Sequence, residues 1–400
     1  MAGLSTHTYS SLARLAHEET KRQSRTINLI ASENYASPAV LKALATPLAN
    51  KYSEGYPRKR YYPGNTFVDA IEERAQALAK KIFSLGSGWS ANVQPYSGSP
   101  ANAEIYFALM DFGGTLMGMS LASGGHLTHG HPITFSGRAY KTIQYGVSKD
   151  GTIDFNEVLK LARKFRPKVI VSGYSAYPRI VDFKKFGEIA KSVGAYHVAD
   201  ISHIAGLIAA RLHPSPFPHA DVVMTTTHKT LRGPRGAVIF SKKELSDRID
   251  RAVFPGFQGG PHNNVTLAKA VAFEEALSKE FTSYQKQIVK NAKALAAMLL
   301  KSDFTLVSGG TDTHLLLMDL RSAGMDGKTA EGILEEGGMT ANRNSIPGDR
   351  KPLYPSGLRL GTPAVTTRGM RVAEMRMIAG WVRDLIIKGR NPREVKKEVE

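Results

Sequence analysis

The order of apolar and polar residues predicts helices that alternate with short buried strands through the first two thirds of the chain. Between residues 69 and 83, apolar side chains recur at the spacing of an amphipathic helix. Short apolar runs bounded by turn residues predict strands. The expected strands are 91–93, 168–171, 196–199, 222–224 and 237–240, and the expected helices are 69–83, 101–111 and 183–193. This alternation favours an α/β architecture, with helices flanking a mostly parallel sheet.

The pattern changes after about Gly260, where longer helices dominate. Helices are expected over residues 266–277, 284–300 and 371–387, with a strand over 314–320. A chain of 400 residues exceeds what one compact core usually holds. We therefore divide it into an N-terminal arm and substrate loop (1–60), a large α/β domain (61–265) and a smaller C-terminal α+β domain (266–400). The tail after Lys388 is expected to be frayed or solvated.

The composition excludes several kinds of chemistry. The chain has no cysteine, which excludes disulfides, thiolate zinc sites, iron–sulfur clusters and a cysteine nucleophile. Its longest stretch without Lys, Arg, Asp or Glu, residues 112–137, is rich in Gly, His, Ser and Thr and cannot form a membrane span. The N-terminus lacks the apolar run of a signal peptide. We expect a cytoplasmic protein with no membrane partner.

The formal net charge of +18 has two interpretations. A basic chain can bind nucleic acid, or its surface can attract anionic substrates and maintain solubility. No helix-turn-helix, RNP or zinc-finger pattern accompanies the charge, and the basic residues are spread along the chain. Nucleic-acid binding is therefore the less favoured interpretation.

The segment Thr225 to Gly236, TTTHKTLRGPRG, places a lysine among hydroxyl side chains between two expected strands. A lysine in such a turn loses its proton more easily and can then attack an aldehyde. The alternative is a lysine in a charged surface loop. The flanking threonines, His228 and the Gly-Pro-Arg-Gly turn favour a reactive Lys229 that carries pyridoxal phosphate (PLP) as a Schiff base.

Asp200 ends an expected strand, and in α/β proteins such strand ends border the ligand site. PLP needs an anion beside its pyridine nitrogen to keep the ring protonated and electron-withdrawing. The alternative role for Asp200 is a helix N-cap. Because Lys229 follows a nearby strand of the same predicted sheet, the cofactor role is favoured.

Three glycine-containing segments are weaker signals. Ser97-Gly98-Ser99 lies between a strand and a helix, where backbone N–H groups and hydroxyls can bind phosphate. Gly259-Gly260-Pro261 is a similar turn, and both also fit ordinary loops. Residues 124–130 contain two histidines among glycines, but no carboxylate or cysteine lies near enough in the sequence to support a metal site. We interpret that loop as placing an imidazole against a planar cofactor, and we expect no metal.

Two further segments carry charges in unusual settings. Glu54 lies among tyrosines and bases in residues 52–62. This fits either an active-site loop with a proton-transfer carboxylate or a basic, aromatic surface segment. Arg359 lies between two leucines, which point the opposite way on a strand. It fits either a clamp for a substrate carboxylate or a surface strand position.

In order along the chain, these segments closely resemble the serine hydroxymethyltransferase family. The resemblance covers residues 28–383 and rests on long, unusual strings. They are Leu29-Ile30-Ala31-Ser32-Glu33-Asn34, residues 124–130, Ser175-Ala176-Tyr177-Pro178-Arg179, the Lys229 segment, Phe254-Pro255-Gly256 with residues 258–261, and Ser308-Gly309-Gly310-Thr311-Asp312. The resemblance implies the aspartate-aminotransferase-like fold of PLP-dependent transferases (fold type I). It also implies interconversion of serine plus tetrahydrofolate with glycine plus methylenetetrahydrofolate.

The same resemblance implies roles for individual residues. Lys229 is the Schiff-base lysine, Asp200 the partner of the pyridine nitrogen, and Glu54 the acid–base carboxylate near the serine hydroxyl and folate. The other catalytic candidates are His126 (stacked on the ring), His203, Tyr62, Thr226 and Arg235. Implied cofactor contacts are Ser97, Gly98, Ser99 and His228 at the phosphate, Ser175 and His203 at the phenolic oxygen, and Tyr52 and Gly260 of a neighbouring subunit. Ser32 and Arg359 bind the substrate carboxylate, and Tyr61, Tyr62, Leu121, Gly125, Leu127 and Asn344 surround substrate and folate.

The shared phosphate contacts imply a homodimer, with a tetramer left open. The chain also departs from the family's pattern. Arg58 stands where glycine is usual, and Ser202 replaces the usual alanine before His203. The stretch 349–354, which borders the folate site, is one residue short and has Leu353 where phenylalanine is common.

Two alternative functions remain. A folate-independent PLP aldolase acting on β-hydroxy amino acids such as threonine would keep Lys229, Asp200 and Arg359. Glu54 and the Tyr61-Tyr62 pair argue against it, whereas the altered loop argues for it. A nucleic-acid-binding or scaffold protein without turnover is the second alternative, and the complete set of cofactor residues argues against that.

Overall fold

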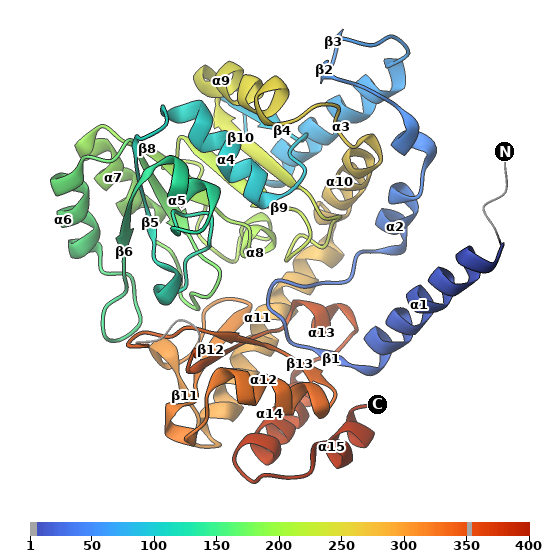
Figure 1. The fold of residues 1–400 in the computed structure, drawn as a ribbon, viewed down its shortest axis with the longest axis vertical. Helices are drawn as coiled ribbons and strands as arrows, with labels where there is room; N and C mark the ends of the chain where they lie inside the picture. The colour runs from blue at the N-terminus through green and yellow to red at the C-terminus, as the bar shows by residue number, and fades with distance from the viewer. Residues whose placement is uncertain (1–5, 350–353) are drawn as a thin grey trace.

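A seven-stranded sheet forms the centre of the larger part of the molecule, as seen in the computed structural model, which describes residues 6–349 and 354–400 (Figure 1). The strand order is β4-β10-β9-β8-β7-β5-β6. Strands β9, β8, β7, β5 and β6 are parallel, and β10 is antiparallel to β9 and β4. The strands are β4 (Trp89–Asn92), β5 (Thr115–Met119), β6 (Lys141–Tyr145), β7 (Val169–Gly173), β8 (Tyr196–Asp200), β9 (Val222–Thr226) and β10 (Ala237–Lys242).

Helices bury both faces of this sheet. Val169 and Val171 of β7 pack into the core on one face, while Ile170 packs into the core on the other. Because both faces are covered, these strands consist of continuous apolar residues rather than alternating ones. One face carries α4 (Gly98–Leu109) and α9 (Ser246–Arg251), and the other carries α3 (Thr66–Ile82), α6 (Phe155–Phe165), α7 (Phe183–Val193) and α8 (Ala205–Ala209). The predicted α/β class is confirmed.

A second, smaller sheet is antiparallel and has the order β11-β12-β15-β14. Its strands are β11 (Thr305–Leu306), β12 (Leu315–Asp319), β14 (Asn342–Asn344) and β15 (Gly357–Gly361). The helices around it are α11 (Lys279–Leu300), α12 (Gly327–Glu336), α13 (Pro363–Thr367) and α14 (Val372–Ile386). Together they enclose a separate apolar core, which agrees with the expected α+β unit.

The C-terminal tail is largely solvated, as expected, but it is not frayed. Residues Pro392–Val399 form helix α15, and Val395 is buried against the core of the smaller sheet. The side chain of Asn391 accepts a hydrogen bond from the N–H of Arg393 and caps the helix, and Pro392 occupies its first turn. Besides this cap, the buried Val395, the partly buried Val399 and the bonds from Trp381 and Arg390 to Glu398 order this charged segment.

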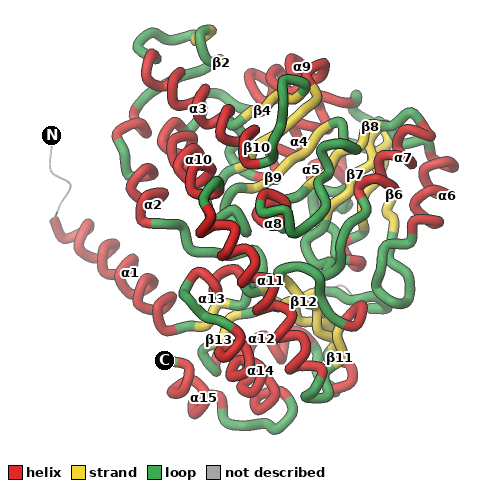
Figure 2. Tube along the Cα trace, turned by 180° about the vertical axis from the view of Figure 1, so that it is seen from behind, coloured by secondary structure: helices red, strands yellow, loops and turns green. Residues whose placement is uncertain are grey.

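The N-terminal arm joins the two parts. Helix α1 (Thr6–Arg25) extends away from the rest of the molecule in both views (Figures 1 and 2). Strand β1 (Ile27–Asn28) then pairs in parallel with β13 (Met339–Thr340). Helix α2 (Pro38–Leu44) packs against α10 (Asn263–Ala276), which also packs on α3. The proposed domain boundaries at 60 and 265 stay a prediction.

A short hairpin, β2 (Gly55–Tyr56) and β3 (Lys59–Arg60), precedes α3 at the upper edge of the molecule (Figure 1). The remaining elements are short: α5 (Phe135–Ala139), η1 (Pro47–Asn50), η2 (Leu121–Ser123), η3 (Lys243–Leu245), η4 (Ala252–Phe257), η5 (Val307–Gly309) and η6 (Arg321–Ala323). Among the residues that the structure describes, no helix combines the length and apolarity that a bilayer crossing requires.

Candidate active site

Four parallel strands deliver the predicted site residues to one edge of the large sheet. Strand β8 ends at Asp200, and β9 is followed by Lys229. Strand β7 precedes Ser175, and β5 precedes the loop with His126. Because the carboxyl ends of parallel strands meet at the same edge, residues from four separate segments lie close together there.

These residues enclose a cavity of about 150 Å³. Most of the predicted catalytic and cofactor residues line it, together with four that were not predicted as site residues: Asn102, Tyr174, Ser202 and Met224. The predicted residues in its lining are Ser97, Gly98, Ser99, His126, Ser175, Asp200, His203, Thr226, His228, Lys229 and Arg235. We call it the Lys229 cavity.

The ammonium group of Lys229 lies at the centre of this arrangement. Its Nζ donates a hydrogen bond to Thr226 Oγ1 at 3.0 Å. The turn that carries it is held by Asn34 Nδ2, which donates to the Lys229 carbonyl at 2.9 Å. Burial, aided by the charges of Arg359 and Arg235 and opposed by Asp200, lowers the pKa of Lys229 to about 8. A usable fraction of the side chain is therefore neutral, and hence nucleophilic, near neutral pH.

Asp200 is a buried carboxylate with several hydrogen-bond donors. Its Oδ2 accepts from Asn102 Nδ2 and pairs with His129 Nε2, both at 3.0 Å. Its Oδ1 accepts from the hydroxyl of Ser202 at 2.6 Å. Burial alone would raise the pKa of Asp200, but His129, His126 and Ser202 outweigh it and hold the pKa well below the usual range. Asp200 therefore stays anionic inside the cavity.

Two of these Asp200 partners were missed as functional residues. His129 lies in the glycine-rich loop, three residues after His126, so its position carried a signal that was not used. Asn102 lies on α4 and meets Asp200 only because that helix packs against the sheet. No local sequence pattern identifies Asn102 as a partner of Asp200. Ser202, one of the departures from the family's pattern, supplies a donor that an alanine would lack.

The N-terminus of α4 forms a small polar cradle. Ser97 is the N-cap, yet its hydroxyl makes no capping bond. A Cβ at Gly98 would lie 2.6 Å from Thr226 Cγ2, so only glycine fits there. Nearby, His228 Nδ1 is buried without a hydrogen-bond partner in the described part of the chain, and burial lowers the pKa of His228 to about 3. Free N–H groups, free hydroxyls and the positive end of a helix suit a phosphate group.

Lys269, in the middle of α10, holds the backbone that leads into the cradle. It is fully buried, and its Nζ donates to the carbonyls of Val93, Pro95 and Ala237 at 2.6, 3.0 and 2.9 Å. An ammonium group has three donors, so all of them are used. These bonds connect the segment before α4 to the start of β10. The sequence analysis did not identify Lys269, although a lone lysine in the apolar stretch Leu267-Ala268-Lys269-Ala270-Val271 is unusual.

The loop with His126 lies tightly against the sheet edge. A Cβ at Gly125 would lie 2.0 Å from the Met119 carbonyl oxygen, which requires glycine. The Gly124 carbonyl accepts from the N–H groups of Ser175 and Ala176 at 2.7 and 3.0 Å. Burial, with a smaller effect of His129, lowers the pKa of His126 to about 4, so the ring is neutral. The predicted substrate residues Leu121, Gly125 and Leu127 flank His126 on this loop.

Arg359, on β15 of the smaller sheet, does not line the cavity but contacts Ser175, which does. Its guanidinium donates to the Ser175 carbonyl at 2.6 Å, to Asn342 Oδ1 at 3.0 Å and to Ser32 Oγ at 3.4 Å. Burial lowers its pKa to about 10. Within the described residues, no carboxylate forms an ion pair with it. A buried cation without an anionic partner is costly, and a carboxylate ligand would supply the missing charge.

Five predicted residues form a separate group that does not line the Lys229 cavity. We call Tyr52, Glu54, Tyr61, Tyr62 and Gly260 the Glu54 cluster. The rings of Tyr52 and Tyr62 have centroids 5.2 Å apart, and a Cβ at Gly260 would lie 3.4 Å from the Tyr52 ring. Glu54 Oε1 would lie 3.3 Å from a Cβ at the adjacent Gly259. These five predicted residues are thus separate from the Lys229 cavity of their own chain.

Two further predictions, Asn344 and the altered loop, also lie outside the cavity lining and the Glu54 cluster. Asn344, at the end of β14, donates its side-chain amide to the Ser345 carbonyl at 2.7 Å, close to the Asn342 that contacts Arg359. The altered folate loop contains residues 350–353, which lie outside the described residues.

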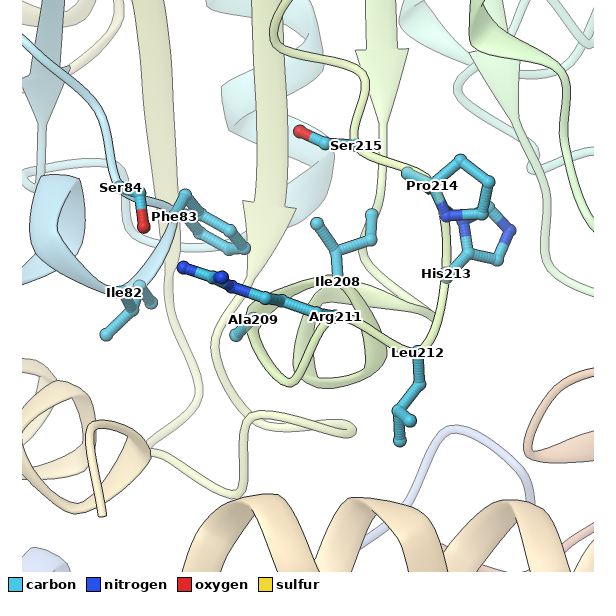
Figure 3. A pocket seen from close by; sticks show the side chains of 10 residues that line it. All are labelled: Ile82, Phe83, Ser84, Ile208, Ala209, Arg211, Leu212, His213, Pro214 and Ser215. Atoms are coloured by element: carbon cyan, nitrogen blue, oxygen red, sulfur yellow. Dashed lines mark hydrogen bonds between the residues drawn. The ribbon is translucent and has the colours of Figure 1, made fainter. Parts of the chain in front are cut away.

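A larger cavity of about 560 Å³ contains none of the predicted residues (Figure 3). It lies between the end of α3 and the segment after α8, and Arg211 extends across it toward Ile82 and Phe83 (Figure 3). Its histidine, His213, already bonds the N–H of Val181 and the Pro214 carbonyl. This cavity therefore offers no free base or nucleophile comparable to Lys229.

Comparison with known proteins agrees with this geometry. The family model described as serine hydroxymethyltransferase matches residues 6–382. A serine hydroxymethyltransferase of Acidothermus cellulolyticus is 56% identical over 379 residues, which are 94% of this chain and 88% of that relative. These matches support neither the aldolase nor the nucleic-acid-binding alternative. The chain belongs to the serine hydroxymethyltransferase family.

Proposed function

We propose that this chain catalyses the reversible transfer of the serine hydroxymethyl carbon to tetrahydrofolate, with PLP covalently attached to Lys229. The observation that carries the proposal is one cavity in which Lys229, with its lowered pKa, lies among Asp200, His126 and the α4 cradle. Bound there, PLP supplies an electron-withdrawing ring that stabilises negative charge at the substrate Cα. The proposal is supported by the presence of an amine, an anion and a polar cradle at the start of α4 in one cavity.

Each residue of the cavity has its own role in binding the cofactor or the substrate. Ser97, Gly98, Ser99 and His228 would hold the phosphate, and Asp200 would keep a proton on the pyridine nitrogen. His126 would pack against the ring, and Ser175 and His203 would contact its phenolic oxygen. Lys229 would carry the cofactor and, as a free amine oriented by Thr226 Oγ1, would move the Cα proton. Arg359 and Ser32 bind the substrate carboxylate.

The Glu54 cluster serves the cavity of a neighbouring subunit in this proposal. Support comes from the separation of the cluster from the Lys229 cavity of its own chain. A twofold dimer would bring each cluster to its partner's cavity. Glu54 then moves protons at the serine hydroxyl, Tyr52 and Gly260 contact the phosphate, and Tyr61 and Tyr62 border serine and folate. The functional unit is thus a homodimer, and a cytoplasmic location remains part of the proposal.

Product analysis of the full chain loaded with PLP tests this function. Serine should yield glycine and methylenetetrahydrofolate, measured by mass spectrometry, only when tetrahydrofolate is present. Threonine cleavage that is faster than serine turnover and indifferent to folate would favour the aldolase instead. Failure to bind PLP would contradict the whole assignment.

Subunit mixing tests the shared site. Lys229→Ala and Glu54→Gln subunits should each be nearly inactive alone. After mixing and exchange, about a quarter of wild-type activity should return, because half of the dimers are hybrids and each hybrid has one intact site. Activity that stays absent in verified hybrids would place Glu54 and Lys229 of one chain in the same site.

Cofactor loading should depend on pH through Lys229. Only the neutral amine attacks the aldehyde, and burial lowers the pKa of Lys229 to about 8. The association rate of PLP with apoprotein should rise about tenfold per pH unit below this value and level off above it. Stopped-flow absorbance measures the rate, with a free alkylamine as the control whose rate keeps rising at higher pH. A continued steep rise for the protein above pH 9.5 would contradict the lowered pKa.

Replacing Arg359 by lysine should weaken substrate binding. Lysine keeps the charge but loses the planar fork that donates to Ser175 and Asn342 while facing a carboxylate. The KM for serine should rise roughly 10- to 100-fold, as expected for lost hydrogen bonds to a charged group. Steady-state kinetics measure it, and Arg343→Lys, an exposed arginine of β14 paired with Glu331, is the matched control. An unchanged KM would remove Arg359 from the substrate site.

A further inference from the structure

The guanidinium of Arg60 lies buried beneath the segment that carries Glu54. Only 4% of its side chain is exposed. Its Nε donates to Asp69 Oδ1 at 2.9 Å and its Nη2 to Glu72 Oε2 at 2.7 Å. Both carboxylates belong to α3, so the arginine is anchored on a helix of the main body.

The third guanidinium nitrogen of Arg60, Nη1, donates to the backbone on both sides of Glu54. Arg60 Nη1 donates to the Ser53 carbonyl at 2.9 Å and to the Gly55 carbonyl at 2.8 Å. The carbonyl of Glu54 itself accepts from the N–H of Tyr61 at 3.0 Å. The three consecutive carbonyls centred on Glu54 are thus bonded by Arg60 and the residue that follows it.

The backbone conformation that allows these hydrogen bonds requires a glycine at position 55. Gly55 has a φ of +94°, and a Cβ there would lie 2.3 Å from the Lys59 carbonyl oxygen. Gln94, next to β4, donates both to the Gly55 carbonyl at 2.9 Å and to Glu72 at 2.8 Å. The same network therefore joins the Glu54 segment, α3 and the edge of the large sheet.

A nearby arginine shows what an ordinary surface pair looks like. Arg58 binds Glu73, and 70% of its side chain is exposed. It bonds none of the three carbonyls around Glu54. Exposed pairs of this kind contribute little to stability, and buried ones are weak stabilisers compared with apolar packing. The buried network at Arg60 is better explained by the geometry it imposes.

We infer that Arg60 is a positioning residue that fixes the backbone on both sides of Glu54, and so sets where the Glu54 carboxylate lies in the neighbouring subunit's site. This inference rests on the proposed function. Loss of the hydrogen bonds from Arg60 displaces Glu54 but leaves the positions of Lys229 and the phosphate cradle unchanged. A displacement near 1 Å can reduce the rate of a positioned proton transfer by on the order of 10²-fold.

A double-mutant cycle tests this role in the full-length holoenzyme. Arg60→Met should lower kcat for folate-dependent serine turnover by on the order of 10²-fold, with a smaller change in the KM for serine. PLP occupancy and the folate-independent exchange of the glycine α-proton with solvent, measured by NMR, should stay within about threefold, because they depend on the Lys229 cavity and involve no substrate hydroxyl. In the Glu54→Gln background, Arg60→Met should lower kcat only slightly further. The effects of two residues are not additive when one residue acts through the other.

Two matched variants complete the experiment. Arg58→Met removes the exposed pair two residues away and should leave both activities unchanged. Arg60→Lys keeps the charge and should restore part of the lost kcat, and it replaces Arg60→Met in the cycle if that variant does not fold. Equal losses in the two activities, or fully additive losses with Glu54→Gln, would show that Arg60 is merely structural. Wild-type enzyme without folate-dependent turnover would instead contradict the proposed function.

Discussion

Replacing Lys229 by alanine should abolish serine turnover while leaving the fold intact. The side chain makes one hydrogen bond, to Thr226, and its turn is held through the backbone by Asn34, so little structure depends on it. The expected loss in kcat is on the order of 10³-fold or more, because the variant lacks both the attached amine and a positioned base. Borohydride reduction followed by peptide mass mapping should find no cofactor attached to the Thr225–Gly236 segment.

The control for this variant is Lys243→Ala, an exposed lysine just after β10. It should keep full activity and full labelling of Lys229. Turnover by Lys229→Ala within tenfold of wild type, with correct folding shown by its melting temperature, would mean that another amine carries the cofactor.

Asp200→Asn should produce the second-largest loss. Asparagine fills the same space, but its NH2 group cannot accept the hydrogen bonds that one carboxylate oxygen accepts from Ser202 or from Asn102. The free energy of unfolding should therefore fall by about 1–3 kcal/mol, the cost of an unpaired buried donor, while the protein still folds. What is lost is the negative charge that His129 and Ser202 stabilise inside the cavity. Removing one preorganised electrostatic group typically costs about 10²–10³-fold in kcat, and we expect a loss of this size in serine turnover.

Asp221→Asn is the matched control, because Asp221 precedes β9 at the opposite edge of the same sheet and pairs with Lys242. Steady-state assays at saturating PLP should show near-normal kcat for this control. If Asp200→Asn kept wild-type kcat at full PLP occupancy, Asp200 would have no electrostatic role in the reaction.

Much of the large sheet could be predicted because local signals and tertiary structure agree. The expected helix 183–193 matches α7 at both ends, where Asp182 caps the first turn and Gly194 adopts a left-handed conformation. Strands β4, β7, β8, β9 and β10 were expected from apolar runs. Strands β5 and β6 were not, since Thr115–Met119 contains glycine and two methionines and Lys141–Tyr145 contains two polar residues and a charge.

The site was predicted as a set of residues, but not as an arrangement. Asp200 could be identified because it ends a strand, and Lys229 because it lies in the hydroxyl-rich turn that follows another strand. His129 and Asn102 act through hydrogen bonds that exist only once α4 and the glycine loop pack on β8, and such partners leave no trace in local spacing. The separation of Glu54 from Lys229 is likewise invisible in a linear sequence, because it depends on how the chain turns between α2 and α3.

The hydrogen bonds of Lys269 determine the state of the phosphate cradle before PLP binds. Its three bonds to the carbonyls of Val93, Pro95 and Ala237 use only groups of the chain itself. The phosphate cradle is therefore built by the polypeptide before any PLP arrives. Purified apoprotein should accordingly be a folded, dormant form that added PLP activates without refolding.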